Sequence, residues 1–288
     1  MRKGFCNMKT TLTEKLKDIP LSRQERVIAD TITKNLQRNA FLNGPQIAAL
    51  CDVAPSTITR FAQKLGYSGF PELKKELEII YRKTTTPHEV FREFLNGNDE
   101  KDVVDTTIEQ DIQNIMNLRT QLDRKTLEKV VEAIDNAKKI LIASIGASET
   151  CVDIFYYYLD ALGKEYIKLK GFGISKQIEI MEIEPNDVVI AISFQRILLE
   201  VRDVAQFAKN RGATTIAITD SEFNALARVC NHILIAPVTA TVYSLSQAAP
   251  VVMVNLIVNS LAALNKDKSL KMLEKTKKEW EEFPIFCE

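Results

Sequence analysis

The sequence predicts two architectures in one chain: an all-α N-terminal domain and a C-terminal α/β domain whose parallel sheet is flanked by helices. Its 288 residues, 45% of them hydrophobic, suffice for about two domains with sizeable cores. After Leu127, short β-branched runs alternate with helical stretches. Residues 1–85 hold 15 Lys/Arg against 8 Asp/Glu (+7), whereas the other 203 hold 23 against 30 (−7). This asymmetry is typical of a basic nucleic-acid-binding end joined to a part with another task.

The N-terminal part predicts a three-helix core. Ser22 and Glu25 form a capping-box pattern that opens the first helix. Within residues 43–69 we expect two short helices with a tight break between them. Gly44-Pro45 begins the first helix and Asp52-Val53-Ala54 breaks it. Pro55 begins the second helix and Gly66 ends it.

The second short helix has two contrasting faces. Apolar side chains at i, i+3, i+4 and i+7 predict a buried stripe of Ile58, Phe61, Ala62 and Leu65. The opposite face carries small hydroxyls, an amide and two cations, which suit base edges and phosphates in a DNA major groove. The predicted DNA-binding residues are Ser56, Thr57, Thr59, Arg60, Gln63, Lys64 and Tyr67. Two short helices with a tight turn are also common in other helical domains, including oligomerisation modules.

The middle of the chain predicts further helices and a linker. Pro71–Tyr81 continues the helical core, and nearby Lys74, Lys75, Arg82 and Lys83 are interpreted as a solvated face. Thr84-Thr85-Thr86-Pro87 indicates a linker, and the segment to Asp102 has no clear pattern. Helical spacing then returns and predicts either an inter-domain helix or a dimer seam. Its apolar positions are Val104, Ile108, Ile112, Ile115, Leu118 and Leu122.

Five continuous apolar runs predict buried parallel strands. They are Lys138–Ser144, Tyr166–Leu169, Asp187–Ser193, Thr214–Thr219 and His232–Ala236. A long apolar helix, Leu245–Leu264, closes the series. Its run Ala248–Leu264 is about the minimum spanning length for a membrane, but it contains Pro250 and polar side chains, so we expect a buried core helix.

Polar residues follow several of these strands, where parallel sheets bind ligands. Gly146 and Ser148 could hold an anion at a helix start, although the sequence has no P-loop. Arg196 could pair with a phosphate or carboxylate, or be a surface arginine. Thr219-Asp220-Ser221 is another strand-end sequence, although it is most often a helix cap. The predicted ligand-binding residues are Gly146, Ser148, Ser193, Gln195, Arg196, Thr219 and Ser244.

Residues suited to catalysis or metal binding are sparse. The five cysteines are scattered without a CxxC, and the two histidines, His88 and His232, cannot complete a Cys/His metal cluster. No GxSxG or HExxH occurs, and residues 239–247 contain no glutamate to act as a base. We expect no catalytic residues, metal or cofactor. The cysteine usage and the apparent lack of a signal peptide predict a reduced, cytoplasmic protein.

With these residues in place, nearly the whole chain resembles the RpiR family of bacterial transcription regulators. The N-terminal match rests on a helix-turn-helix signature: Arg60-Phe61, Leu65-Gly66-Tyr67, Gly69-Phe70 and Leu73-Lys74. The series from about Leu127 to Leu264 resembles a SIS (sugar isomerase) domain. This chain departs from the family's Ser-x-Ser-Gly-x-Thr phosphate loop, because Gln195, Arg196 and Leu198 replace the second serine, the glycine and the threonine. Ala54 also replaces the serine that usually caps the recognition helix.

The resemblance implies a homo-oligomeric regulator, a homodimer or homotetramer, that binds a double-stranded DNA operator and a carbohydrate effector. The effector would be a sugar phosphate or related anionic metabolite. The alternative is a sugar-phosphate isomerase with an accessory helical domain. The expected domains are residues 1–83 (helix-turn-helix), 84–126 (linker and connecting helix), 127–266 (SIS) and 267–288 (helical tail).

Overall fold

A computed structural model gives the fold, and the chain divides into two compact units, residues 1–93 and residues 94–288. Each unit has its own hydrophobic core, as expected for separate domains. The residues that the structure describes are 12, 15–16, 19–34, 36–84, 86–97, 102–170, 174–240 and 242–282.

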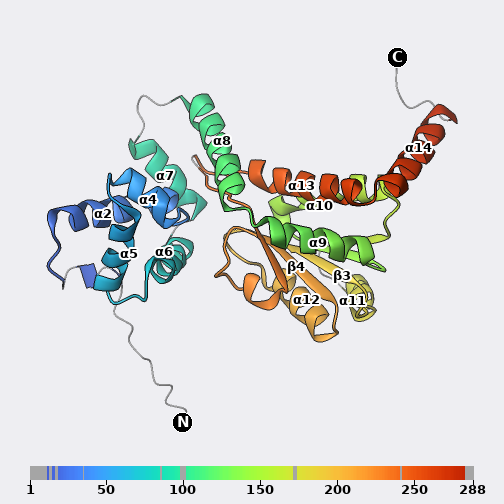
Figure 1. The fold of residues 1–288 in the computed structure, drawn as a ribbon, viewed down its shortest axis with the longest axis horizontal. Coiled ribbons are helices and arrows are strands. Elements are labelled where there is room, and N and C mark those ends of the chain that lie inside the picture. The colour runs from blue at the N-terminus through green and yellow to red at the C-terminus, as the bar shows by residue number, and fades with distance from the viewer. Residues whose placement is uncertain are drawn as a thin grey trace, which may run out of the picture. The chain divides into compact units, whose positions relative to one another are not determined.

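The first unit is a small helical domain (Figure 1). Its helices are α2 (Arg23–Lys34), α3 (Leu36–Asn39), α4 (Gly44–Leu50), α5 (Pro55–Lys64) and α6 (Phe70–Thr84), and α7 (Pro87–Gly97) follows them. The predicted capping box at α2 is confirmed: the Ser22 N–H donates to Glu25 Oε2 (2.7 Å) and the Glu25 N–H to Ser22 Oγ (3.3 Å). The predicted apolar stripe on α5 is also confirmed, because all four side chains lie in the core.

Backbone geometry explains the tight break between α4 and α5. Asp52 adopts a left-handed conformation (φ 52°), which Asp tolerates better than most residues. Ala54 provides no side-chain cap for α5, whereas Pro55 fixes its first turn. At the far end Gly66 (φ 85°) lets the Tyr67 N–H donate to the Ala62 carbonyl (3.1 Å). This Schellman-type closure satisfies a carbonyl that the end of the helix leaves open.

The segment after α6, predicted to be a linker without clear pattern, contains helix α7 instead. Thr86 and Glu89 form a second capping box, with the Glu89 N–H donating to Thr86 Oγ1 at 3.3 Å. The Thr-x-x-Glu spacing is present in the sequence, but the run Thr84-Thr85-Thr86-Pro87 is also typical of a linker. Pro87 instead occupies the first helical position, where a missing N–H costs nothing.

The second unit contains a five-stranded sheet in which every neighbouring pair is parallel, in the order β2-β1-β3-β4-β5. The predicted strands are therefore confirmed: β4 has the predicted bounds, and the ends of the others differ by at most two residues. The strands are β1 (Ile140–Ser144), β2 (Tyr166–Lys170), β3 (Val188–Ile192), β4 (Thr214–Thr219) and β5 (His232–Ile235). Their near-continuous apolar character follows from burial on both faces.

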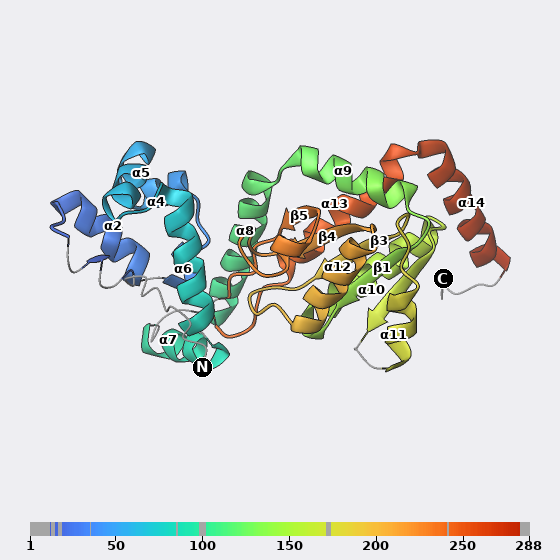
Figure 2. The same cartoon turned by 90° about the horizontal axis from the view of Figure 1, so that it is seen from below.

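Helices cover both faces of this sheet (Figures 1 and 2). On one face α9 (Arg124–Asn136), α10 (Glu149–Ala161) and α13 (Ala248–Leu264) share a core with β1, β3 and β4. On the other face, α12 (Leu199–Asn210) packs four buried side chains against β1, β3 and β4. Alternate residues along each strand enter the two cores: Ile190 joins the first and Ala191 the second. The remaining elements of this unit are α8 (Val103–Gln121), α11 (Ile174–Met181), α14 (Lys266–Glu282) and the short helices η1 (Gly146–Ser148) and η2 (Ala227–Val229).

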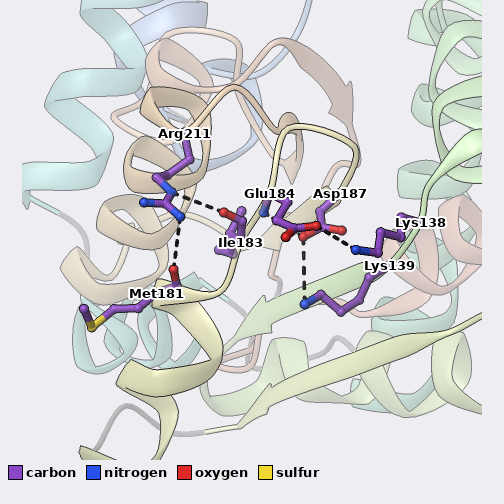
Figure 3. Close-up of polar contacts among 7 residues, drawn as sticks. All are labelled: Lys138, Lys139, Met181, Ile183, Glu184, Asp187 and Arg211. Atoms are coloured by element: carbon purple, nitrogen blue, oxygen red, sulfur yellow. Dashed lines mark hydrogen bonds and ion pairs between the residues drawn. The ribbon is translucent and has the colours of Figure 1, made fainter.

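Ion pairs and hydrogen bonds close the edge of the sheet where β1 and β3 begin (Figure 3). Buried Asp187 accepts the Glu184 N–H at 2.8 Å and lies 3.9 Å from Lys139 Nζ, while Lys138 pairs with Glu184 at 2.7 Å. Arg211 at the end of α12 donates to the carbonyls of Ile183 and Met181. These contacts join the segments that lead into β1, β3 and β4. The opposite edge, where the parallel strands end, carries the polar loops.

The apolar helix α13 lies in the core, as predicted, with seven of its side chains buried. Within the described part of the chain, no single helix has the length and apolar character needed to cross a membrane. Only α13 together with Lys266–Lys278, a pair bent by 106°, meets those requirements, on length and composition alone.

Candidate functional site

The outer face of α5 presents most of the predicted DNA-binding side chains to solvent. Ser56, Thr59, Arg60, Gln63 and Lys64 are exposed, and Thr57 is half-buried. They share this face because the apolar stripe fixes the rotation of the helix against the core. Arg60 Nη2 lies 3.5 Å from Thr57 Oγ1. The arrangement provides hydroxyl, amide and guanidinium donors in one row, as a major-groove recognition helix requires.

Lys64 differs from Arg60 because it is ion-paired within the unit. Its Nζ lies 2.7 Å from Glu25 Oε2, which joins the end of α5 to the start of α2. The hydrogen bond from Lys64, followed by that from the Ser22 N–H, lowers the pKa of Glu25. An anion that binds Lys64 would therefore have to displace Glu25. The sequence identified Glu25 only as a capping residue, because its contact with Lys64 spans 39 positions.

Tyr67 is a core residue and not part of the exposed face. It is 5% exposed, and burial raises the pKa of its phenol to about 12. Its ring packs beneath Lys15, whose Nζ lies 3.7 Å from the ring centroid. This burial argues against the predicted direct contact with DNA. Tyr67 instead supports the turn that ends α5.

The second candidate site is the edge where the parallel strands end. Because all five strands are parallel, their carboxyl ends meet at one edge, where open α/β sheets bind ligands. The structure brings the loops after β3 and β4 into direct contact. Thr219 Oγ1 donates to the Ser193 carbonyl (2.7 Å) and accepts from Asn224 Nδ2 (2.6 Å). Thr219 is fully buried and its hydroxyl is already bonded to both loops, so it positions the loops and does not bind a ligand directly.

The loop after β3 departs from the phosphate-loop pattern and has an unusual backbone. Gln195 adopts φ 51°, a left-handed conformation that costs a non-glycine residue about 1 kcal/mol. Its N–H donates to Asp220 Oδ1 at 3.0 Å. A buried carboxylate therefore occupies a loop N–H that could otherwise face an anionic ligand. The sequence indicated Asp220 only as part of a helix cap with Thr219 and Ser221, because its contact with Gln195 spans 25 positions.

The loop after β1 shows a similar internal contact. Gly146 has φ 74°, and its N–H donates to Glu149 Oε1 at 3.1 Å. Ser148 is almost buried. The preceding Ser144, at the end of β1, is also buried, and its hydroxyl has no hydrogen-bond partner among the described residues. Ser144 was not predicted as a site residue because it also fits a strand end. An unsatisfied buried hydroxyl at this edge is a candidate ligand contact.

Arg196 and Ser244 are exposed, in the loops after β3 and β5 respectively. The edge thus combines a solvent-facing guanidinium with buried hydroxyls and with loop N–H groups bonded to carboxylates. His232 lies at the start of β5, which is the opposite end of the strand from this site. Burial lowers the pKa of its imidazole. His88 is exposed on α7.

One hydrogen bond links this edge to α8. Asn114 is fully buried on α8, and its Nδ2 donates to the Thr239 carbonyl at 3.0 Å. Thr239 belongs to the segment between β5 and α13, which also carries Ser244. The α8 helix is the one that leads toward the helix-turn-helix unit along the chain. Asparagine in a helical pattern gave no signal of this contact, which spans 125 positions.

Two family models match the chain. A helix-turn-helix domain of the rpiR family matches residues 6–84, and a SIS domain matches residues 133–265. Among curated relatives, an HTH-type transcriptional regulator of Haemophilus influenzae is 25% identical over 217 residues, or 75% of each chain. The HTH-type transcriptional regulator YfhH of Escherichia coli K12 is 26% identical over 218 residues, covering 74% of this chain and 76% of the relative.

Solved structures agree with this fold. The sugar isomerase domain of an RpiR transcription factor from Sphaerobacter thermophilus has a TM-score of 0.60 at 26% identity, covering 62% of this chain and 99% of that one. Vibrio vulnificus NanR, solved with ManNAc-6P, has a TM-score of 0.57 at 20% identity, covering 96% and 99%; at that identity the likeness shows the fold alone. The chain belongs to the RpiR family of transcriptional regulators, with an rpiR-type helix-turn-helix domain followed by a SIS domain.

Proposed function

We propose that this protein is a transcription regulator whose SIS domain binds a sugar phosphate or related anionic carbohydrate and thereby modulates operator binding. The observation that carries the proposal is the exposed face of α5, with Arg60 and its neighbouring hydroxyl and amide side chains held outward by a buried apolar stripe. Such a face on the second helix of a helix-turn-helix suits the major groove. The net charge of +7 in residues 1–85 favours association with phosphates.

The carboxyl edge of the sheet is the proposed effector site. Arg196 supplies a cation, and Ser144, Ser148 and Ser193 supply hydroxyls at strand ends. The loop N–H groups of Gly146 and Gln195 already bond to Glu149 and Asp220. A phosphate that used them would displace those carboxylates, so we assign the principal charge contact to Arg196. The Asn114–Thr239 hydrogen bond supports coupling from this edge to α8.

The proposed assembly is a homo-oligomer, at minimum a homodimer. A dimer would present two recognition helices about one DNA turn apart, roughly 34 Å, to a near-palindromic operator. We do not assign an enzymatic role, because the curated relatives are named as regulators and this edge of the sheet carries no histidine in the described residues.

Two measurements test the proposal. A binding duplex selected from fragmented genomic DNA should bind the protein with an affinity that falls steeply as salt rises. A thermal-shift screen of sugar phosphates (ManNAc-6P among them), sugar acids and amino sugars should find a compound that raises the melting temperature and changes that affinity. Binding that does not depend on salt or duplex sequence would contradict the DNA-binding role. Steady turnover of a sugar phosphate would favour the isomerase alternative.

A further inference from the structure

Helix α8 has an inner face that packs in its own unit and an outer face that is apolar but exposed. The inner face includes Asn114 and Leu118, both buried. The outer face exposes large apolar side chains by 37% to 61%. We name this outer face the α8 seam; it consists of Val104, Ile108, Ile112, Ile115 and Met116. A contiguous apolar stripe of this kind on a soluble domain marks an interaction surface.

We propose that the α8 seam binds the α8 seam of a second copy of this chain, with the two helices antiparallel about a two-fold axis at Ile112. The inference rests on the proposed homo-oligomer and assigns it a surface. Removing these side chains from water is favourable, so the seam would form the apolar centre of a dimer interface.

Two charges identify the partner and the direction of pairing. Asp105 and Arg119 lie on the same side of α8 as the seam, because each is seven residues, almost two whole helical turns, from Ile112. Both are exposed, and Ile112 lies midway between them. In an antiparallel pair, Asp105 of each copy meets Arg119 of the other, and Ile108 meets Met116. A parallel pair would place like charges opposite each other at both ends.

The midpoint of α8 coincides with this axis, since the helix runs from Val103 to Gln121. The amino ends of two such antiparallel helices would therefore be about 27 Å apart at 1.5 Å per residue. Each amino end connects along the chain to a helix-turn-helix unit.

Disulfide trapping tests the axis directly. In the full chain with Cys6 and Cys287 replaced by serine, the described native cysteines, Cys51, Cys151 and Cys230, are buried. A thiol added at the axis meets the same thiol of the partner. A thiol added eight residues from the axis lies about 24 Å from the same thiol of the partner, far beyond disulfide range. Ile112→Cys should therefore give a covalent dimer under mild oxidation, and Val104→Cys should not. Crosslinking of both variants would indicate parallel pairing, and crosslinking of neither would place the seam outside the interface. Either result would overturn the proposal.

Charge reversal provides an independent test by analytical ultracentrifugation. Asp105→Lys or Arg119→Glu alone creates two like-charge contacts per dimer and should raise the dimer dissociation constant roughly tenfold. The double variant should restore it, and an unchanged far-ultraviolet circular dichroism spectrum in all three variants is the control for folding. A wild-type monomer would contradict the proposed homo-oligomer and the seam with it. A wild-type dimer indifferent to both single changes would contradict only the seam, leaving the oligomer standing.

Discussion

The outer face of α5 and the carboxyl edge of the sheet present their polar groups in opposite ways. On α5, the polar side chains are mostly exposed, and only Lys64 has a strong partner, Glu25. At the sheet edge, Thr219, Asp220 and Asn224 are buried and hydrogen-bonded within their own loop or to the loop after β3. A surface that meets DNA acts through side chains available to an outside partner. At the carboxyl edge of the sheet, the buried polar groups must first be hydrogen-bonded within the protein, so only a few polar groups remain for a ligand.

The largest effect is expected from removing Arg60. If DNA affinity did not fall, the exposed side chains of α5 would not be the DNA-binding groups. Arg60→Ala should weaken binding to the selected duplex by about 1–3 kcal/mol, since a well-placed arginine–base contact contributes that much. Fluorescence anisotropy at fixed salt measures this. Arg124→Ala, an exposed arginine in the other unit, is the matched control for the lost charge. Equal effects of the two changes would mean that α5 contributes only net charge.

The next effect concerns Asn114, which links the sheet edge to α8. Asn114→Leu has a similar volume but leaves the Thr239 carbonyl buried without its donor, a loss of about 1–3 kcal/mol in the free energy of unfolding. Chemical denaturation measures this, and the change in DNA affinity caused by the effector should shrink in parallel. Asn136→Ala, which removes an exposed hydrogen bond within α9, is the control. Full effector response in Asn114→Leu would exclude this bond as the coupling contact.

Arg196 tests which group at the carboxyl edge of the sheet binds the effector. Because it is the cation we assign to the effector, Arg196→Ala should weaken binding of the screened sugar phosphate about tenfold while affinity for the duplex without effector is unchanged. Isothermal calorimetry measures the first quantity and anisotropy the second. Arg202→Ala, whose guanidinium pairs with Asp203 on α12, serves as control. An unaltered effector affinity would remove Arg196 from the site.

The smallest effect is expected at Glu25. Glu25→Gln frees Lys64 for a phosphate, so the slope of log affinity against log salt should steepen by about 0.9. The pKa of Glu25 is lowered, so the ion pair is present above that pKa and is lost as pH falls through it. Acidification to below the pKa should therefore mimic the variant in wild-type protein. The same slope at both pH values, and in the variant, would show that Lys64 does not contact DNA.

The sequence by itself determined the class of both domains. Strand positions followed from apolar runs that burial on both faces requires, and the α5 stripe followed from helical spacing. The exposed face of α5 was predictable for the same reason: once one side of a helix is buried, the other side is exposed. Tyr67 is the exception: it was predicted on the exposed face but is buried. It follows the end of α5, so helical spacing does not determine which way its side chain points.

Only the tertiary structure decided how the polar groups pair. The partners of Lys64, Gln195 and Asn114 lie 39, 25 and 125 positions away, so no local pattern contains them. Register between parallel strands sets the Ser193–Thr219 contact, and it depends on how the whole sheet assembles. Helical spacing in α8 left an inter-domain helix and a dimer seam equally open. The fold distinguished the faces of α8, because the core can bury only the side of a helix that it touches, and left Ile112 on the other.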